Sequence, residues 1–171
     1  MSRYLTHMKR LNDPAEPVER FFSIFEPMKE KMGPVLIQLP PNLKFEYEKV
    51  ETFYKELRKY PGYSFAMEGR HTTWLEKESL DLMTKYDMAF VISQSGHGFP
   101  YAEYVTSKNI YIRFHGPGKL YASLYTDEDL KKFARLIKTW KQQGHVIWIS
   151  FNNDYFGYAI QNARRLEELV G

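Results

Sequence analysis

Apolar and polar residues alternate along this chain with two periods, one typical of strands and one typical of helices. Five short segments rich in apolar and β-branched residues are predicted strands, and they span residues 35–39, 63–70, 88–93, 110–115 and 146–151. Five segments with apolar residues three and four positions apart are predicted helices, and they span residues 18–28, 50–57, 73–86, 126–143 and 159–170. Strands and helices that alternate between short breakers are typical of parallel βα units. The sequence therefore predicts an α/β protein with a parallel sheet.

Helix boundaries are marked by capping residues and prolines. Pro27 predicts a kink or an early end in the first helix. Thr73 with Glu76 predicts a capping box at the start of the third helix, and Thr126 with Asp129 predicts a cap for the fourth.

Polar side chains gather at the carboxyl end of every predicted strand. They are Gln38, Glu68 with Arg70, Ser93, Arg113 with His115, and Asn152 with Asn153. In the fourth strand, Tyr111, Arg113 and His115 share one face, and the other face is apolar. A buried guanidinium without partners costs roughly several kcal/mol, so the polar face differs from an ordinary core face. Because carboxyl ends of parallel strands form the sites of βα proteins, we expect these residues to line one cavity.

Composition limits the chemistry that this cavity can perform. The chain has no cysteine, which excludes disulfides, thiolate nucleophiles and cysteine-ligated metals. Glu68, His71, His115 and Asp154 are possible metal-ligand types, but they have no close ligand spacing, so no metal site is predicted. The net charge of +3 comes from intermixed acidic and basic residues, which permits nucleic-acid binding without indicating it.

Length and hydropathy predict one domain over residues 1–171 with its own core. No apolar run approaches the roughly 18 residues of a membrane span, and the N-terminus lacks a signal-peptide pattern. We therefore expect no membrane partner and a cytoplasmic location. His97, in a loop flanked by glycines, is expected to face solvent.

Ordered motifs along the whole chain resemble one known family. They are Gly33 to Pro41, Glu68-x-Arg70-His71 with Trp74, Tyr111-x-Arg113-x-His115-Gly116, and Phe151-Asn152-Asn153 with Ala159 and Asn162-Ala163. In order and spacing they are similar to the YecE-like family, domain of unknown function 72, as is the opening Leu5-Thr6-His7 with Arg10-Leu11. The resemblance implies a TIM-barrel-like (β/α)8 fold of uncharacterised function, similar in shape to sugar-phosphate isomerases and the endonuclease of abasic DNA repair.

The resemblance also implies an incomplete barrel. Family members usually carry further strands before the segment that corresponds to Thr6-His7. The chain therefore resembles the C-terminal two-thirds of the barrel, with about five strands present and the N-terminal strands missing. Open strand edges favour self-association or a companion chain that completes the barrel.

Two arginines and two groups that can transfer protons give the predicted cavity its chemistry. Arg70 and Arg113 suit a phosphate, sulfate or carboxylate, because guanidinium binds such anions in a bidentate manner. Glu68 either transfers protons or neutralises an arginine in a structural ion pair. His115 is a candidate general acid or base, and His71 a less central ligand-binding candidate; alternatively, each imidazole donates to a backbone carbonyl.

Three amide side chains complete the set of predicted ligand-binding residues. Gln38 is expected to bind a ligand at the end of the first strand. Asn152 and Asn153 can orient a hydroxyl or an oxyanion, or can form an Asx turn that starts the last helix.

Two functions fit these residues. The first is a hydrolase or lyase that acts on a phosphorylated or sugar-containing small molecule. The alternative is a protein that binds, or a nuclease-like enzyme that cuts, abasic or single-stranded DNA. The sequence indicates no particular cofactor and leaves open whether the protein is an enzyme. Salt dependence separates the two functions, because nucleic-acid binding weakens steeply with salt.

Overall fold

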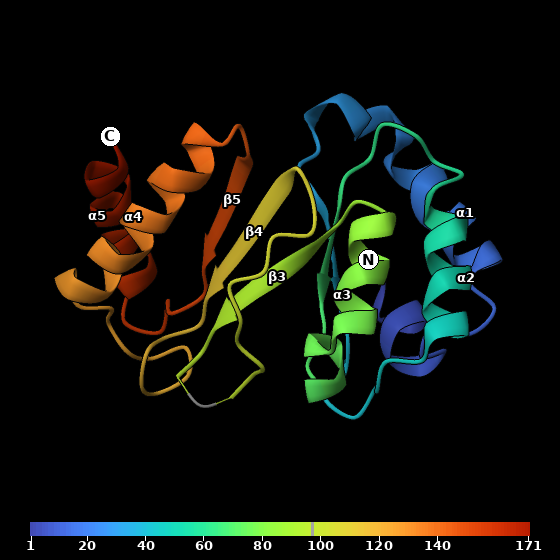
Figure 1. Cartoon of the computed structure of the whole chain (residues 1–171), viewed down its shortest axis with the longest axis horizontal. Coiled ribbons are helices and arrows are strands. Elements are labelled where there is room, and N and C mark those ends of the chain that lie inside the picture. Colours follow the sequence, from blue (N-terminus) through green and yellow to red (C-terminus); the bar gives the residue numbers. More distant parts are fainter. Residues whose placement is uncertain (97) are drawn as a thin grey trace. The chain divides into compact units, whose positions relative to one another are not determined.

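The structure is a computed structural model that describes residues 1–96 and 98–171, so the prediction for His97 lies outside the described residues. Five strands pair in the order of the chain, and every pair is parallel. The strands are β1 (Val35–Gln38), β2 (Phe65–Glu68), β3 (Met88–Gln94), β4 (Asn109–Phe114) and β5 (Val146–Phe151). Figure 1 labels β3, β4 and β5. The α/β class and the parallel strands are therefore confirmed, and the complete (β/α)8 barrel stays a prediction.

The described residues also form five α-helices and three short helices of other types, which precede, connect or follow the strands. The helices are α1 (Ala15–Phe25), α2 (Tyr47–Leu57), α3 (Lys77–Lys85), α4 (Asp127–Gln142) and α5 (Tyr158–Val170). The short helices are the π-helix η1 (Tyr4–Met8) and the 3₁₀ helices η2 (Glu26–Lys31) and η3 (Thr72–Leu75). The early end at Pro27 is confirmed, since α1 gives way to a 3₁₀ turn that contains this proline. The cap at Thr126 is also confirmed, because Thr126 and Asp129 each accept a hydrogen bond from the other's backbone N–H.

The predicted capping box of Thr73 and Glu76 is wrong. Helix α3 starts after Glu76, which makes no side-chain cap, and Thr73 lies in η3. The N–H of Thr73 donates to Nδ1 of His71 at 3.2 Å, and its hydroxyl accepts from the N–H of Phe45 at 2.9 Å. Burial of Trp74 gives the physical reason, because it holds this segment as a separate turn against the core.

The chain forms two compact units. Unit 1 comprises Met1–Phe90 and Tyr104–Ser107, and unit 2 comprises the described residues of Val91–Glu103 and Lys108–Gly171. Strand β3 belongs to both, since its first residues pair with β2 and its later residues pair with β4. The expected single domain stays a prediction, and each unit has a core of its own.

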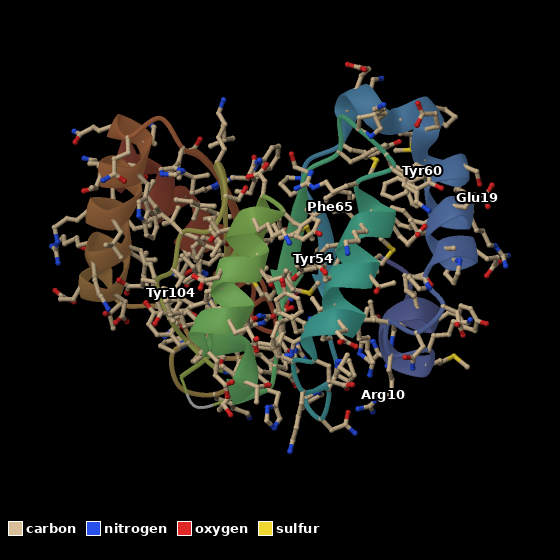
Figure 2. The ribbon with its side chains drawn as sticks, turned by 45° about the vertical axis from the view of Figure 1, so that its right-hand side comes forward. Arg10, Glu19, Tyr54, Tyr60, Phe65 and Tyr104 are labelled. Atoms are coloured by element: carbon tan, nitrogen blue, oxygen red, sulfur yellow. The ribbon has the colours of Figure 1, made fainter. Side chains whose placement is uncertain are left out.

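Aromatic rings form much of the core of unit 1. The ring of Phe22 in α1 stacks on Tyr60, with centroids 4.4 Å apart, and contacts Phe65 of β2 edge-on at 6.0 Å. Figure 2 labels Tyr60 and Phe65 in this unit, together with Tyr54 of α2. Phe22, Tyr54 and Phe65 are almost completely buried, and the contact of Phe22 with Phe65 packs α1 against the sheet.

Alternation along β4 organises the core of unit 2. Its even-numbered residues are buried, whereas Tyr111 and Arg113 are half-buried, in agreement with the predicted period of two. The ring of Phe114 contacts Phe133 of α4 edge-on at 4.7 Å and stacks on Phe151 of β5 at 4.6 Å. Figure 1 shows α4 and α5 on the same side of β5. The apolar face of β4 therefore packs beneath the helices.

Candidate functional site

A buried carboxylate at the end of β2 is the centre of the polar rim in unit 1. The parallel register places Gln38 of β1 directly beside Glu68 of β2. Nε2 of Gln38 donates to Oε2 of Glu68 at 2.7 Å, and Glu68 is only 1% exposed. The neighbouring strand therefore supplies a hydrogen bond that a buried carboxylate needs.

Arg70 approaches the same carboxylate from the loop after β2. Its Nη2 lies 3.8 Å from Oε1 of Glu68, which is close enough for an ion pair. Gly69 sits between them, and a Cβ at this position would overlap the ring of Trp74. The Trp74 indole is buried and donates to the carbonyl of Leu43 at 2.9 Å. Only glycine permits this close approach of the backbone to the indole at the residue between the two charged side chains.

The N-terminal segment adds a pocket beside Gln38. This open pocket measures about 410 Å³. Its lining residues are Met1, Arg3, Thr6, His7 and Gln38 with Phe21, Phe25, Met32, Val35 and Leu36. The Thr6 hydroxyl hydrogen-bonds Nδ1 of His7 at 2.8 Å. Burial lowers the pKa of His7, and the positive charges of Arg3 and Arg70 lower this pKa further. The ring is therefore held in its neutral form near neutral pH.

Two contacts fasten this segment to β1 and its following loop. The α-ammonium group of Met1 donates to the carbonyl of Leu36 at 2.8 Å, and burial lowers the pKa of this amine. Arg10, which Figure 2 labels, donates to Oδ1 and to the backbone oxygen of Asn42 at 3.1 and 2.9 Å. Sequence reasoning assigned no site role to Thr6 or His7. The only available signal was their place in the family's opening motif.

His71, predicted to bind a ligand, lies at the start of η3. Its Nδ1 accepts the N–H of Thr73 at 3.2 Å and lies 3.1 Å from the Thr73 hydroxyl. The imidazole therefore caps a turn in unit 1.

In unit 2, His115 follows β4 and is 1% exposed. Its backbone N–H donates to the carbonyl of Gln94 at 2.8 Å, which continues the pairing of β4 with β3. The imidazole ring contacts Phe99 and Tyr121 edge-on, with centroids 5.2 and 5.6 Å away. Aromatic packing therefore restricts the orientation of this ring.

Tyr125 ties the backbone beside His115 to β3. Its phenolic oxygen accepts the N–H of Gly116 at 2.9 Å, and its O–H donates to the side chain of Gln94. Burial raises the pKa of Tyr125, so the phenol stays protonated. Gly116 has φ +108°, a conformation that favours glycine.

Asn153 belongs to a buried amide network. Its Nδ2 donates at 2.9 Å both to the carbonyl of Ser123 and to Oδ1 of Asn162. Asn162 in turn bonds both the N–H and the carbonyl of Tyr125 at 3.1 Å. Helix α5 starts after Gly157 without a side-chain cap, so the alternative of an Asx turn that starts this helix is wrong.

Arg113 and Asn152 complete the predicted residues of unit 2. The register places Arg113 between Ser93 of β3 and Ser150 of β5. Asn152 extends the pairing of β5, because its N–H donates to the carbonyl of Phe114 at 2.7 Å. The Ser150 hydroxyl donates to Oδ1 of Asn152 at 3.4 Å. Small hydroxyl side chains therefore flank the guanidinium within the sheet.

The structure thus brings together three of the predicted residues in unit 1, Gln38, Glu68 and Arg70. His7, which the sequence did not predict as a site residue, is close enough to Arg70 for its charge to lower the imidazole pKa. Arg113, His115, Asn152 and Asn153 all follow or end the strands of unit 2. In the described part of the chain, no three histidine, aspartate or glutamate side chains cluster in a way that would hold a metal ion. The described helices include none with the length and apolarity to cross a membrane.

The parallel sheet, its helices and the polar residues at the strand ends place the chain in the class of α/β proteins built from βα units. Within that class, the chain belongs to the DUF72 family, described as proteins of unknown function, because the family model matches residues 1–171. The resemblance stated from the motifs is confirmed. Among curated proteins, no match to this chain was found.

Solved structures of the same family are similar to the chain. A DUF72 family protein from Thermotoga maritima is 29% identical, with a TM-score of 0.86 over 99% of this chain and 71% of that one. Two crystal structures of a DUF72 family protein from Enterococcus faecalis are 20% and 22% identical, with TM-scores of 0.81 and 0.75. The first match spans 93% of this chain and 66% of the Enterococcus chain. The second match spans 90% of this chain and 67% of the Enterococcus chain.

Proposed function

We propose that unit 1 binds a small anionic molecule beside Gln38 and acts on it as a hydrolase or lyase. The substrate class is a phosphorylated or sugar-containing compound. One observation carries the proposal: the buried carboxylate of Glu68 is hydrogen-bonded by Gln38 and lies 3.8 Å from Arg70, and Gln38 also lines the 410 Å³ pocket.

Positive charge around the pocket supports anion binding. Arg3 lines the pocket, and Arg70 is close enough to His7 to lower the pKa of its imidazole. The field that disfavours a proton on His7 favours an anion in the same place. A guanidinium also suits phosphate geometrically, since two parallel N–H groups meet two oxygens.

Two groups in unit 1 can transfer protons. Glu68 is held by Gln38 as a hydrogen-bond acceptor, which suits a general base. His7, kept neutral by burial and nearby cations, can accept a proton from a ligand hydroxyl. The part of Arg113, His115, Asn152 and Asn153 in binding or catalysis stays a prediction.

A binding measurement with matched arginine variants tests the proposal. Calorimetric titration with inorganic phosphate and with a hexose phosphate should give saturable binding that Arg70→Met weakens at least about tenfold, or 1.4 kcal/mol. Arg135→Met removes an exposed arginine from α4 in unit 2 and should leave the binding constant unchanged. Equal loss in both variants, or no binding to the unaltered chain, would contradict the proposal.

Salt dependence tests the alternative function. Arg70 would then contact a backbone phosphate of abasic or single-stranded DNA. Such binding should weaken with a slope of about 0.7 in log K per neutralised phosphate against log salt. A steep slope with a single-stranded oligonucleotide, together with no response to hexose phosphate, would favour the alternative.

A further inference from the structure

A small pocket in unit 2 lies between the end of β3, the segment that follows β3, and the first turns of α4. It measures about 190 Å³. Strand β3 pairs with β2 on one side and with β4 on the other, so the pocket does not adjoin an outer strand of the sheet. Pockets for drug-sized ligands measure roughly 300 to 1,000 Å³, so this one suits a smaller molecule with a single ring.

Two hydrogen-bond donors that line this pocket have no acceptor among the described residues. Oγ of Ser95 accepts the N–H groups of Gly98 and Phe99 at 3.3 and 3.0 Å, so its own O–H remains to donate. Ser95 is only 5% exposed. Oε1 of Gln94 accepts the O–H of Tyr125, which leaves Nε2 of the same amide as the second donor. A buried donor without an acceptor is costly, so a ligand or water that offers lone pairs is favoured here.

The carboxylate of Asp129 in α4 adds an acceptor to the pocket lining. Its Oδ2 accepts the N–H and the O–H of Thr126 at 3.0 and 2.8 Å, and Oδ1 has no donor in the described part of the chain. A hydroxyl group both donates and accepts. A ligand with several hydroxyls can therefore donate to Asp129 and accept from Ser95 and Gln94, whereas an amine or an anion satisfies only one kind of partner.

The charges around the pocket also favour a neutral ligand. Lys132 lines it, but Nζ of this lysine lies 3.4 Å from Oε1 of Glu103, which neutralises the cation. The same Nζ lies 6.0 and 5.8 Å from the ring centroids of Tyr101 and Phe133. An anion would meet the Asp129 carboxylate, and a ligand cation would meet an ammonium group already beside these rings.

Aromatic rings form the apolar part of the lining. They belong to Phe99, Tyr101 and Phe133. Tyr101 is 39% exposed, and its O–H donates to Glu103. Burial raises the pKa of Tyr101, and the Glu103 carboxylate raises it further, so the phenol stays protonated. The face of an aromatic ring is partly negative, and it attracts the weakly positive C–H groups of a sugar ring.

We propose that this pocket binds a neutral monosaccharide. Hydroxyls of the sugar accept hydrogen bonds from Ser95 and Gln94 and donate to Asp129, and the C–H face of the sugar lies against the ring of Tyr101. The proposal concerns unit 2 alone and does not depend on the anion pocket of unit 1.

Titration of the full chain with D-glucose and D-ribose tests the proposal, with calorimetry and saturation-transfer NMR as readouts. At least one of the two sugars should bind saturably. Tyr101→Leu removes the ring and should weaken this binding at least about fivefold. Tyr101→Phe keeps the ring, loses only the bond to Glu103, and should bind as the unaltered chain does.

A second variant tests the polar contacts independently. Gln94→Glu keeps an oxygen that accepts the O–H of Tyr125 and removes the amide donor, so it should weaken sugar binding several-fold. Lys138→Met changes an exposed residue of α4 and should leave binding unchanged. Arg70→Met in unit 1 should also leave sugar binding unchanged, which separates this site from the proposed phosphate site. Circular dichroism spectra of all variants should match that of the unaltered chain.

Three results would overturn the proposal. The first is that neither sugar binds saturably. The second is that sugar binding is equally strong in Tyr101→Leu and Gln94→Glu. The third is tighter binding of choline or inorganic phosphate than of either sugar, with loss of that binding in Tyr101→Leu, because the pocket would then prefer a charged ligand.

Discussion

Unit 1 and unit 2 end their strands with different chemistry. In unit 1 the rim holds a buried carboxylate beside a cation, Glu68 and Arg70, at 3.8 Å. In unit 2 the buried polar groups include neutral amides, and Asn153 and Asn162 bond each other and the backbone of Tyr125. Neutral amides that satisfy one another stabilise a fold, whereas a buried ion pair contributes little net stability. If the proposed function holds, the charged rim of unit 1 is kept for chemistry, and we predict that the amide network of unit 2 is kept for structure.

The largest expected effect comes from crowding the backbone of the unit 1 rim. Gly69→Ala should lower the free energy of unfolding by about 3 kcal/mol, because the new Cβ overlaps the buried ring of Trp74. Urea denaturation followed by fluorescence measures it. Gly118→Ala in unit 2 is the control, since the nearest atom to its Cβ is 4.0 Å away, and it should change stability by less than about 0.5 kcal/mol. Equal effects of the two substitutions would contradict this account of the rim.

Removal of one amide tests the structural role of the unit 2 network. Asn162→Ala removes the side-chain partner of the N–H and carbonyl of Tyr125, and it removes one of the two acceptors of the Asn153 amide. Loss of these buried hydrogen bonds should cost about 2 to 3 kcal/mol in urea unfolding. Gln161→Ala changes the adjacent exposed residue and should be nearly neutral. A cost below about 1 kcal/mol for Asn162→Ala would show that the network is not structural.

Neutralising the carboxylate of unit 1 should affect stability less and binding more. Glu68→Gln keeps a side chain that can bond Gln38, so we expect a loss of about 1 kcal/mol in unfolding free energy. Phosphate should bind several-fold more tightly, because Arg70 loses a competing anion. Any turnover of a phosphorylated substrate should fall sharply, as a base is removed. Glu48→Gln on the exposed surface of α2 is the control, and weaker phosphate binding in Glu68→Gln alone would contradict the expected role.

The smallest effect is a pH dependence confined to unit 1. The pKa of His7 is lowered in the folded state, first by burial and then by Arg3 and Arg70. The unfolded chain therefore binds the proton more readily, and stability should fall as pH drops below the ordinary imidazole pKa of about 6.5. Thermal melts between about pH 5 and 7.5 should show a shallower decline for His7→Gln than for the unaltered chain. Identical slopes would show that neither burial nor the two arginines lower the pKa of His7 in the folded state.

Much of this architecture follows from the sequence alone. The order of strands and helices, the two faces of β4 and the cap at Thr126 all depend on residues a few positions apart. Local backbone geometry sets these periods, so they can be read without knowledge of distant contacts. Family membership was equally accessible, since the motifs that carry it are contiguous.

Only the tertiary structure decided which polar residues meet. Gln38 and Glu68 are 30 positions apart, as are Asn153 and Ser123, and in each case a hydrogen bond joins them. His71 caps η3, where the local signal of Thr73 and Glu76 predicted the start of a longer helix, and the segment holds the buried Trp74. The amine of Met1 reaches Leu36 across 35 positions, a contact that no periodicity predicts. Such pairings depend on where folding places distant backbones, because a polar group bonds whichever partner burial brings within reach.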